Sequence, residues 1–439
     1  MSKKLATHFN LFIISKVVII TISVIMICIT NSVFGQNNQD TLKLNIPSLE
    51  KRFIDSNFLL LAAHFNVDAQ KALIEQAKVW QNPTINTDFM AGADGKFFNY
   101  GKYDDGKGGH FLGQYYVQIQ QLIMTAGKRG KLIKMANTNA KLSELQMQDV
   151  LRNLRYQLHQ DYYNLNQQLS LLQLYNQQEI QLDKLLTGMQ AQLSVGNIAQ
   201  KDLVRIKALS IALQQDKTDL LKSISDTQND LKTLLQIKDT KTFIKPLEEN
   251  TTTTIPNDGL DKLINQALQS NPSYILQQTT TTYQQQNLAY QKALRTPDLT
   301  LGPNFDRNSN FAPNYVGLGI SLPLPVFNKN QGNIKSAQYG IKQQEALTSN
   351  AETELINNVT NAYQKLVLTV KQNSAYQESF YSQYETIYNN MLDSYRKREI
   401  NLLEFLDFYN DYSASQQRLL QQQLNLHLAE EELKYQVGK

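Results

Sequence analysis

The sequence predicts a mainly α-helical protein with a small membrane-type β part, organised as two tandem repeats. Landmarks recur at a constant offset, which is the same between Ser56 and Ser270 as between Pro83 and Pro297 (270 − 56 = 297 − 83 = 214). Each proline precedes two short segments in which apolar and polar residues alternate, followed by helical patterns much longer than those of ordinary domains. This period far exceeds the ~20–50 residues of solenoid repeats, so we interpret the chain as a duplicated half-protein.

Residues 1–35 have the features of a secretory signal peptide, with a basic start, an apolar core over 11–29 and a cleavage site before Gln36. An N-terminal membrane anchor is the alternative, because the apolar core approaches the length that spans a bilayer. The single cysteine, Cys28, lies inside this segment. The mature chain is therefore expected to contain no disulfide and no reactive thiol, although it leaves the cytoplasm.

The first repeat, residues 36–237, combines one helix, two strands and a long helical hairpin. Helical spacing of apolar residues predicts the helix, which ends before Pro83. Strict alternation predicts the strands. The expected elements are helix 48–81, strands 84–91 and 114–122, and helices 128–193 and 200–235.

The second repeat, residues 259–439, follows the same plan after a linker over 238–258 that contains Thr and Pro. Its expected elements are helix 260–295, strands 298–305 and 315–322, and helices 331–394 and 402–436.

The four strands have one apolar face and one polar or small face, which is typical of strands in an outer membrane. Two soluble hairpins are the alternative interpretation. Four strands cannot close a barrel alone, since small single-chain barrels have about eight. An open strand edge is not tolerated in lipid. If the strands lie in a membrane, several chains must therefore share one barrel.

The long helices carry independent information. The run over 128–193 would extend on the order of 100 Å at ~1.5 Å per residue, too long to fold back into a globule. Its apolar residues form a narrow stripe, and Gln, Asn and Thr cover the rest. Such a face suits the wall of a water-filled tube, and a solid coiled-coil rod is the alternative.

At this point the chain resembles the TolC family of outer-membrane efflux proteins over residues 40–437. The features that carry the resemblance are the two repeats and the order and spacing of several short motifs. These motifs are Asn82-Pro83 and Thr296-Pro297 before the strands, Ser270-Asn271-Pro272, the strand exit Leu322-Pro323-Leu324-Pro325-Val326-Phe327, and the two hairpin tips at Val195-Gly196-Asn197-Ile198 and Tyr395 to Asp407.

The resemblance implies a homotrimer in which twelve strands form an outer-membrane barrel and the helices form a periplasmic tunnel. Such a duct is a passive exit for small molecules or metal ions, delivered by an inner-membrane pump through a periplasmic adaptor protein. The implied adaptor contacts are the tips, Val195, Gly196 and Asn197 in one repeat and Arg398 and Glu399 in the other. A periplasmic adaptor and a structural coiled-coil envelope protein are the alternative classes.

The second tip contains two candidate functional carboxylates and one departure from the family. The family often has Gly where this chain has Arg398. Glu404 and Asp407 lie three residues apart, so they can share one helix face. They match the position where the family places carboxylates around the periplasmic mouth of the tunnel. In a trimer they would form rings that favour cations, while a solvated helix face or ion pairs with neighbouring Arg and Lys are the alternative.

Other function classes find no support in the sequence. The net charge of +4 is small and evenly spread, so nucleic-acid binding is not expected. The histidines share no zinc-like spacing with each other or with carboxylates, and no glycine-rich loop precedes a helix. We therefore expect no catalytic residue, no bound metal and no cofactor, and we interpret the chain as a non-enzyme.

Overall fold

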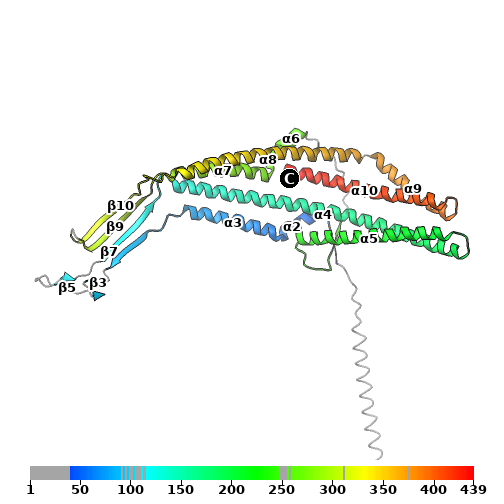
Figure 1. Cartoon of the computed structure of the whole chain (residues 1–439), viewed down its shortest axis with the longest axis horizontal. Helices are drawn as coiled ribbons and strands as arrows, with labels where there is room; N and C mark the ends of the chain where they lie inside the picture. The colour runs from blue at the N-terminus through cyan, green and yellow to red at the C-terminus, as the bar shows by residue number, and fades with distance from the viewer. Residues whose placement is uncertain are drawn as a thin grey trace, which may run out of the picture.

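The computed structural model shows an elongated molecule with a β-sheet at one end and helices along the rest of its length (Figure 1). Three parts of the expected organisation lie outside the described residues. They are the expected signal peptide, the strand ends at residues 90, 91 and 114, and most of the linker after 247. The structure describes residues 40–89, 115–247, 255–256, 259–309, 312–373 and 375–439, with short strands β3 (Gly92–Ala93), β4 (Lys96–Phe97), β5 (Lys102–Tyr103) and β6 (His110–Phe111) between them.

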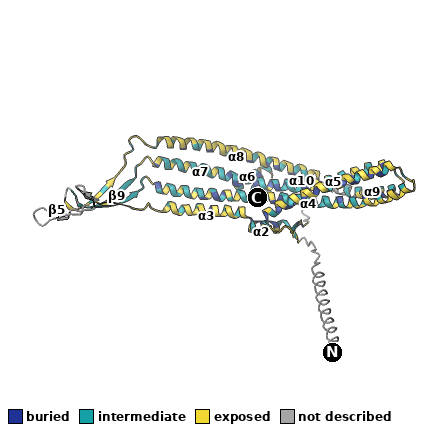
Figure 2. Ribbon diagram, turned by 60° about the horizontal axis from the view of Figure 1, so that its bottom comes forward, coloured by how far each residue is buried: buried dark blue, intermediate teal, exposed yellow. Residues whose placement is uncertain are grey.

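Four helices form one layer in the order α3, α4, α7, α8, so helices from the two repeats lie side by side (Figure 2). The longest, α4, is continuous over 67 residues, or about 100 Å. In the half of the molecule away from the sheet, α5 packs on α4, and α10 packs against α4, α8 and α9 (Figure 1). The bounds are α3 Phe58–Lys78, α4 Lys128–Ser194, α5 Gln200–Leu234, α7 Pro272–Ala293, α8 Gln331–Gln372, α9 Ala375–Arg396 and α10 Leu402–Val437.

The sheet contains one hairpin from each repeat, in the strand order β10-β9-β7-β2, with every neighbouring pair antiparallel. The central pair, β7 and β9, joins the two repeats. Among the described residues, strands β2 and β10 each pair on one side only and form the two edges of the sheet. The bounds are β2 Thr84–Phe89, β7 Tyr115–Ile123, β9 Leu299–Asn308 and β10 Pro313–Ser321.

The strand register gives this sheet two chemically different faces. One cross-strand row consists of apolar residues, and its outer members Ile85 and Leu318 are 66% and 67% exposed. The adjacent row, on the other face, consists of amides and glycine. The apolar row is Ile85, Ile119, Pro303 and Leu318, and the polar row is Asn86, Gln118, Asn304 and Gly317. The sheet therefore turns apolar side chains outward instead of burying them.

Each of the helices expected over 48–81 and 260–295 is in fact two helices, separated by an asparagine. Asn57 separates α2 (Ile46–Ser56) from α3, and Asn271 separates α6 (Leu260–Ser270) from α7. Asn57 Oδ1 accepts the N–H groups at the start of α3, and its Nδ2 donates to the carbonyl of Leu234 at 2.9 Å. The Asn57 side chain thus caps α3 and also binds a free carbonyl at the end of α5. These hydrogen bonds stabilise the break more than a continuous helix through residue 57 would.

The serine before each asparagine makes a matching contact. Ser56 Oγ donates to the carbonyl of Leu235, and Ser270 Oγ donates to the carbonyl of Val437. In both repeats the Ser-Asn pair therefore binds the carboxyl end of the helix that returns from the hairpin tip. The sequence repeat noticed at these serines reflects a repeated helix-end clamp.

Two further expectations need correction. The helix expected over 331–394 is divided into α8 and α9, and Asn373, a poor helix former, ends α8. The expected linker over 238–258 contains a strand, β8 (Phe243–Pro246), which pairs in parallel with β1 (Thr41–Leu44). Tyr162 holds this pair against α4, because its hydroxyl donates to the carbonyls of Leu44 and Leu247.

An Asn57→Ala substitution is expected to lower the free energy of unfolding by about 1–2 kcal/mol, because it removes a helix cap and leaves the Leu234 carbonyl unpaired. Thermal unfolding of the protein in detergent, followed by circular dichroism, measures the change. Asn66→Ala is the matched control, since Asn66 is exposed on the same helix. Equal effects of the two substitutions would contradict the clamp.

Candidate functional site

The two hairpin tips have the same backbone geometry. At the first tip Gly196 has a φ of +74°, and the N–H of Asn197 donates to the carbonyl of Gln192 at 2.9 Å. At the second, Arg398 has a φ of +64°, and the N–H of Glu399 donates to the carbonyl of Ser394 at 2.9 Å. Both are helix ends closed by a residue in the left-handed conformation.

Arg398 therefore occupies a backbone position that glycine adopts at no steric cost. Its guanidinium donates to Oε1 of Gln192, on the helix that leads into the first tip. The same oxygen accepts a hydrogen bond from Nδ2 of Asn197 at 3.1 Å. A third contact joins the hairpins nearby, where the Tyr395 hydroxyl lies 3.8 Å from Sδ of Met189. Arg398 thus links the two tips, which a glycine there would not do.

The remaining tip residues are exposed. Val195 is 67% exposed, and Gly196, Asn197, Arg398 and Glu399 are also on the surface. The structure brings the two expected contact regions together at the end of the molecule farthest from the sheet (Figure 1). An apolar side chain, a backbone turn and charged groups therefore form a continuous surface there.

The two candidate carboxylates lie in the first turns of α10. Asn401 caps this helix, and Glu404 Oε2 accepts the N–H of Asn401 at 3.1 Å in a capping box. Glu404 is therefore anchored to the tip, whereas Asp407 is exposed one turn later. Two of the nearby cations have other partners: Arg396 pairs with Asp393 at 3.3 Å, and Arg398 bonds Gln192.

Stacked aromatic rings support the second tip. Tyr395 stacks on Phe405 with 5.0 Å between ring centroids, and Tyr388 stacks on Tyr412 at 4.1 Å. Burial, with the nearby Glu385, raises the pKa of Tyr412 to about 12, so its hydroxyl stays neutral at physiological pH. The α9–α10 hairpin that carries Glu404 and Asp407 is thus held by aromatic packing.

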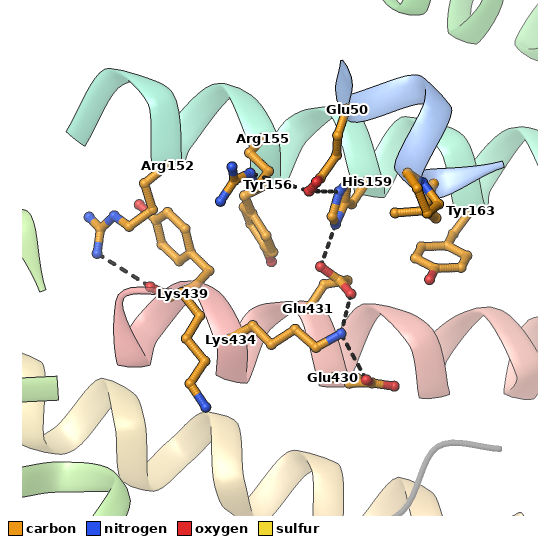
Figure 3. Close-up of a pocket in the computed structure, with 13 residues that line it drawn as sticks. Glu50, Arg152, Arg155, Tyr156, His159, Tyr163, Glu430, Glu431, Lys434 and Lys439 are labelled. Atoms are coloured by element: carbon orange, nitrogen blue, oxygen red, sulfur yellow. Dashed lines mark hydrogen bonds and ion pairs between the residues drawn. The ribbon is translucent and has the colours of Figure 1, made fainter. Parts of the chain in front are cut away.

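A second cluster of polar groups lies midway along the helices, between α2, α4 and α10 (Figure 3). His159 is at its centre: Nδ1 lies 2.5 Å from Glu431 and Nε2 lies 2.9 Å from Glu50. Arg155 also contacts Glu50, at 3.2 Å, and Lys434 contacts Glu431 at 2.8 Å. The cluster surrounds a cavity of about 490 Å³, lined by Ile46, Pro47, Glu50, Arg152, Arg155, Tyr156, His159, Tyr163, Glu430, Glu431, Lys434, Tyr435 and Lys439.

Electrostatics tie this cluster together. Burial raises the pKa of the Glu431 carboxyl, but its bonds with His159 and Lys434 outweigh burial and leave the pKa below its usual value. Burial lowers the pKa of the Lys434 ammonium, but Glu430 and Glu431 outweigh it and raise the pKa. The charged residues at its centre thus have partners of opposite sign. The cluster acts as an ion network that fixes α2 and α10 to α4.

The described residues contain no group of three or more His, Cys, Asp or Glu side chains placed to hold a metal ion. Within the same part of the chain, no helix has both the length and the apolar character needed to cross a bilayer. Sequence reasoning missed the His159 network, because Glu50 lies in a different helix and Glu431 is 272 residues away in the chain. No spacing rule connects residues so distant.

Replacing Glu431 with Gln is expected to destabilise the protein by about 2 kcal/mol at pH 7, since it leaves His159 and Lys434 without their shared buried carboxylate. Glu432→Gln is the control, because Glu432 pairs with the half-exposed Lys365 and should cost less than about 1 kcal/mol. Thermal unfolding in detergent ranks the two. A larger effect of the control would contradict the network.

The same substitution should change the pH dependence of stability. A carboxyl whose pKa is lowered by folding stabilises the protein above its unfolded pKa of about 4.3, and this contribution is lost as pH falls through the folded pKa. The wild type is therefore expected to lose more stability than Glu431→Gln when pH falls below about 4. Parallel unfolding curves for the two proteins at every pH would contradict this linkage.

Comparisons with known proteins agree with this geometry. The curated cobalt-zinc-cadmium resistance protein CzcC of Cupriavidus metallidurans is 21% identical over 361 residues, covering 80% of each chain. The solved structure of CusC has a TM-score of 0.73 at 16% identity, covering 90% of this chain and 92% of that one. The CmeC outer membrane channel of Campylobacter jejuni has a TM-score of 0.75 at 13% identity, covering 90% and 85%.

The sequence model of the outer membrane efflux protein family matches both repeats, over residues 50–235 and 263–439, which is most of the chain. The family is one of channels and transport ducts, and the solved channels share the long helical layer described above. The chain therefore belongs to the outer membrane efflux protein family, the TolC family of channels.

Proposed function

We propose that this protein is the outer-membrane channel of a tripartite efflux system. It acts as a passive exit duct for small molecules or metal ions that an inner-membrane pump and a periplasmic adaptor deliver. One observation carries the proposal: an open four-stranded sheet with an exposed apolar face lies at the end of a helical layer about 100 Å long. Membership of the efflux family supports it independently.

The sheet supports a shared barrel. Strands β2 and β10 each have one side that pairs with no strand among the described residues. Unpaired backbone groups are not tolerated in the hydrocarbon core of a membrane. Pairing β10 of one copy with β2 of the next satisfies both edges, and three copies give twelve strands around one lumen. The apolar rows then face lipid, and the row with Gln118 and Asn304 faces water.

The helices would then extend into the periplasm as a tunnel, with the tips at the far end. Val195, Gly196, Asn197, Arg398 and Glu399 are the proposed adaptor contacts, because they form the exposed surface of both tips. Efflux relatives include a protein named for cobalt, zinc and cadmium resistance, which supports metal ions as one class of cargo.

Glu404 and Asp407 are the proposed carboxylates of the periplasmic mouth. Arg396 and Arg398 are bonded to Asp393 and Gln192, so neither of them neutralises these carboxylates. Asp407 is exposed, and Glu404 uses only Oε2 in its capping box, which leaves its other oxygen for a passing cation. In a trimer they would form two rings of three negative charges around one passage. Such rings favour cations over anions and bind divalent ions more strongly than monovalent ones.

The purified protein is expected to have three times the mass of one chain in detergent, because one chain supplies only four strands and two open edges. Native mass spectrometry, or light scattering corrected for bound detergent, measures it. Full strand content in a stable monomer would contradict the shared barrel.

The double substitution Glu404→Gln and Asp407→Asn is expected to abolish two properties of the channel, its preference for cations and its block by divalent ions. Both effects depend on the ring charges, which the double variant removes. Single-channel conductance in planar bilayers, with asymmetric salt and added Mg²⁺, measures them.

The matched control is Asp226→Asn with Asp230→Asn, which removes two exposed carboxylates from the part of α5 that lies far along the helix from the tips. It should keep both properties of the wild type. If the Glu404 and Asp407 variant retains its selectivity and its block, these side chains do not line the mouth.

A further inference from the structure

A basic hollow lies where the second hairpin meets the helices, between the end of α7 and the start of α8. Its volume is about 500 Å³, and three of the residues that line it, Arg295, Lys329 and Lys335, are cationic while none is acidic. All three are exposed, and among the described residues no ion pair involves any of them. The remaining lining residues are Gln331, Ile334 and Gln338.

The two walls of this hollow are tied together. Asn330 has a φ of +57°, and its Nδ2 donates to the carbonyl and to Oε1 of Gln291, at 2.8 and 3.0 Å. The N–H of Lys329 donates to Oε1 of Gln331 at 2.8 Å. No side chain caps the first turn of α8, so its backbone N–H groups add partial positive charge at the same place. The cations therefore stay close together in spite of their mutual repulsion.

The equivalent junction in the first repeat uses its cations differently. Lys128 is buried and donates to Asp298 at 2.7 Å. Arg129 donates to the carbonyl of Lys78 and lies over the ring of Trp80, 4.6 Å from its centroid. These side chains are satisfied inside the chain. Only the second junction leaves a group of cations for a partner from outside.

An apolar segment adjoins the hollow. Leu324, Val326 and Phe327 lie between the end of β10 and Lys329, and they are 73%, 63% and 93% exposed. An exposed apolar segment beside clustered cations, at the end of a membrane-type strand, is typical of a site for anionic lipid at a membrane surface. Soluble phosphate would gain nothing from the apolar segment.

We propose that this hollow binds the phosphate of an anionic phospholipid whose acyl chains lie along Leu324, Val326 and Phe327. The proposal rests on the proposed placement of the sheet in a bilayer. Arg295, Lys329 and Lys335 supply the charge, and the apolar segment makes a membrane lipid the ligand. Three such sites would surround the base of the trimer and hold it at the inner surface of its membrane.

The chain has one tryptophan, which allows a direct test. In the reporter protein, Trp80→Phe removes it and Phe327→Trp places the single tryptophan of each chain two residues before Lys329. The full-length trimer is placed in vesicles of phosphatidylglycerol and phosphatidylcholine in which the acyl chains of one lipid or the other carry bromine, a quencher. We expect the site to bind brominated phosphatidylglycerol at least about fivefold more strongly than brominated phosphatidylcholine. A single cation at a membrane surface already gives about this preference for an anionic lipid.

Adding Arg295→Gln and Lys335→Gln to the reporter should make the two lipids quench equally. The matched control carries Lys201→Gln and Lys207→Gln, two exposed cations on α5 near the opposite end of the molecule, and should keep the preference. Native mass spectrometry of the wild type in detergent provides a second measurement without the reporter substitutions. It should show more phosphatidylglycerol than phosphatidylcholine adducts.

The outcomes separate the two proposals. Quenching by neither lipid would place residue 327 outside the bilayer and would overturn the membrane placement of the sheet. Equal quenching of the reporter by both lipids, or loss of preference in the control variant, would overturn the lipid site alone. Binding of inorganic phosphate as tight as that of phosphatidylglycerol, measured by tryptophan fluorescence in detergent, would identify a soluble-anion site and also overturn it.

Discussion

The two open edges of the four-stranded sheet impose the main constraint on this molecule. Outward-facing backbone groups on β2 and β10 have no strand partner among the described residues, and the apolar face is exposed. A sheet of this kind is not stable alone in water, because it exposes both apolar surface and hydrogen-bonding edges. The proposed membrane placement would satisfy the apolar face, and neighbouring copies of the chain would satisfy the edges in the proposed trimer. The long helices would then extend from the base of a barrel that no single chain completes.

The duplication preserves helix ends more strictly than connections. The asparagine clamps keep the offset of the serines and prolines (271 − 57 = 214). Gly127 and Asn330, the residues with positive φ that precede α4 and α8, have a smaller offset (330 − 127 = 203). The second repeat is therefore shorter in the stretch that contains the hairpins, where connections on a surface tolerate insertions. The tips at Gly196 and Arg398 have nearly the same offset as the helix starts (398 − 196 = 202). The long helices that lead to the tips thus kept almost equal lengths, although the second is broken at Asn373.

Local rules anticipated the elements whose signal lies in neighbouring residues. Alternation indicated β7 and β10, and the glycine at Gly196 indicated a tip. The same rules failed to predict the helix breaks at Asn57 and Asn271, because the helical pattern continues through both residues. These breaks are stabilised by hydrogen bonds to the carbonyls of Leu234 and Gln436, which lie far along the chain. They also missed the pairing of β1 with β8. Contacts between distant segments decide these features, and no spacing within the sequence encodes them.

The two repeats differ most where the duct would meet other molecules. At the sheet end, the first junction buries Lys128 against Asp298, while the second leaves its cations exposed beside Phe327. At the tips, Gly196 closes one turn without a side chain, while Arg398 accepts a strained conformation and reaches Gln192. A non-glycine residue in the left-handed region costs on the order of 1 kcal/mol, so the contact with Gln192 is made at a conformational cost that glycine would not have. Duplication thus supplied a symmetric frame, and these differences between its halves lie at the two ends where we propose that partners bind.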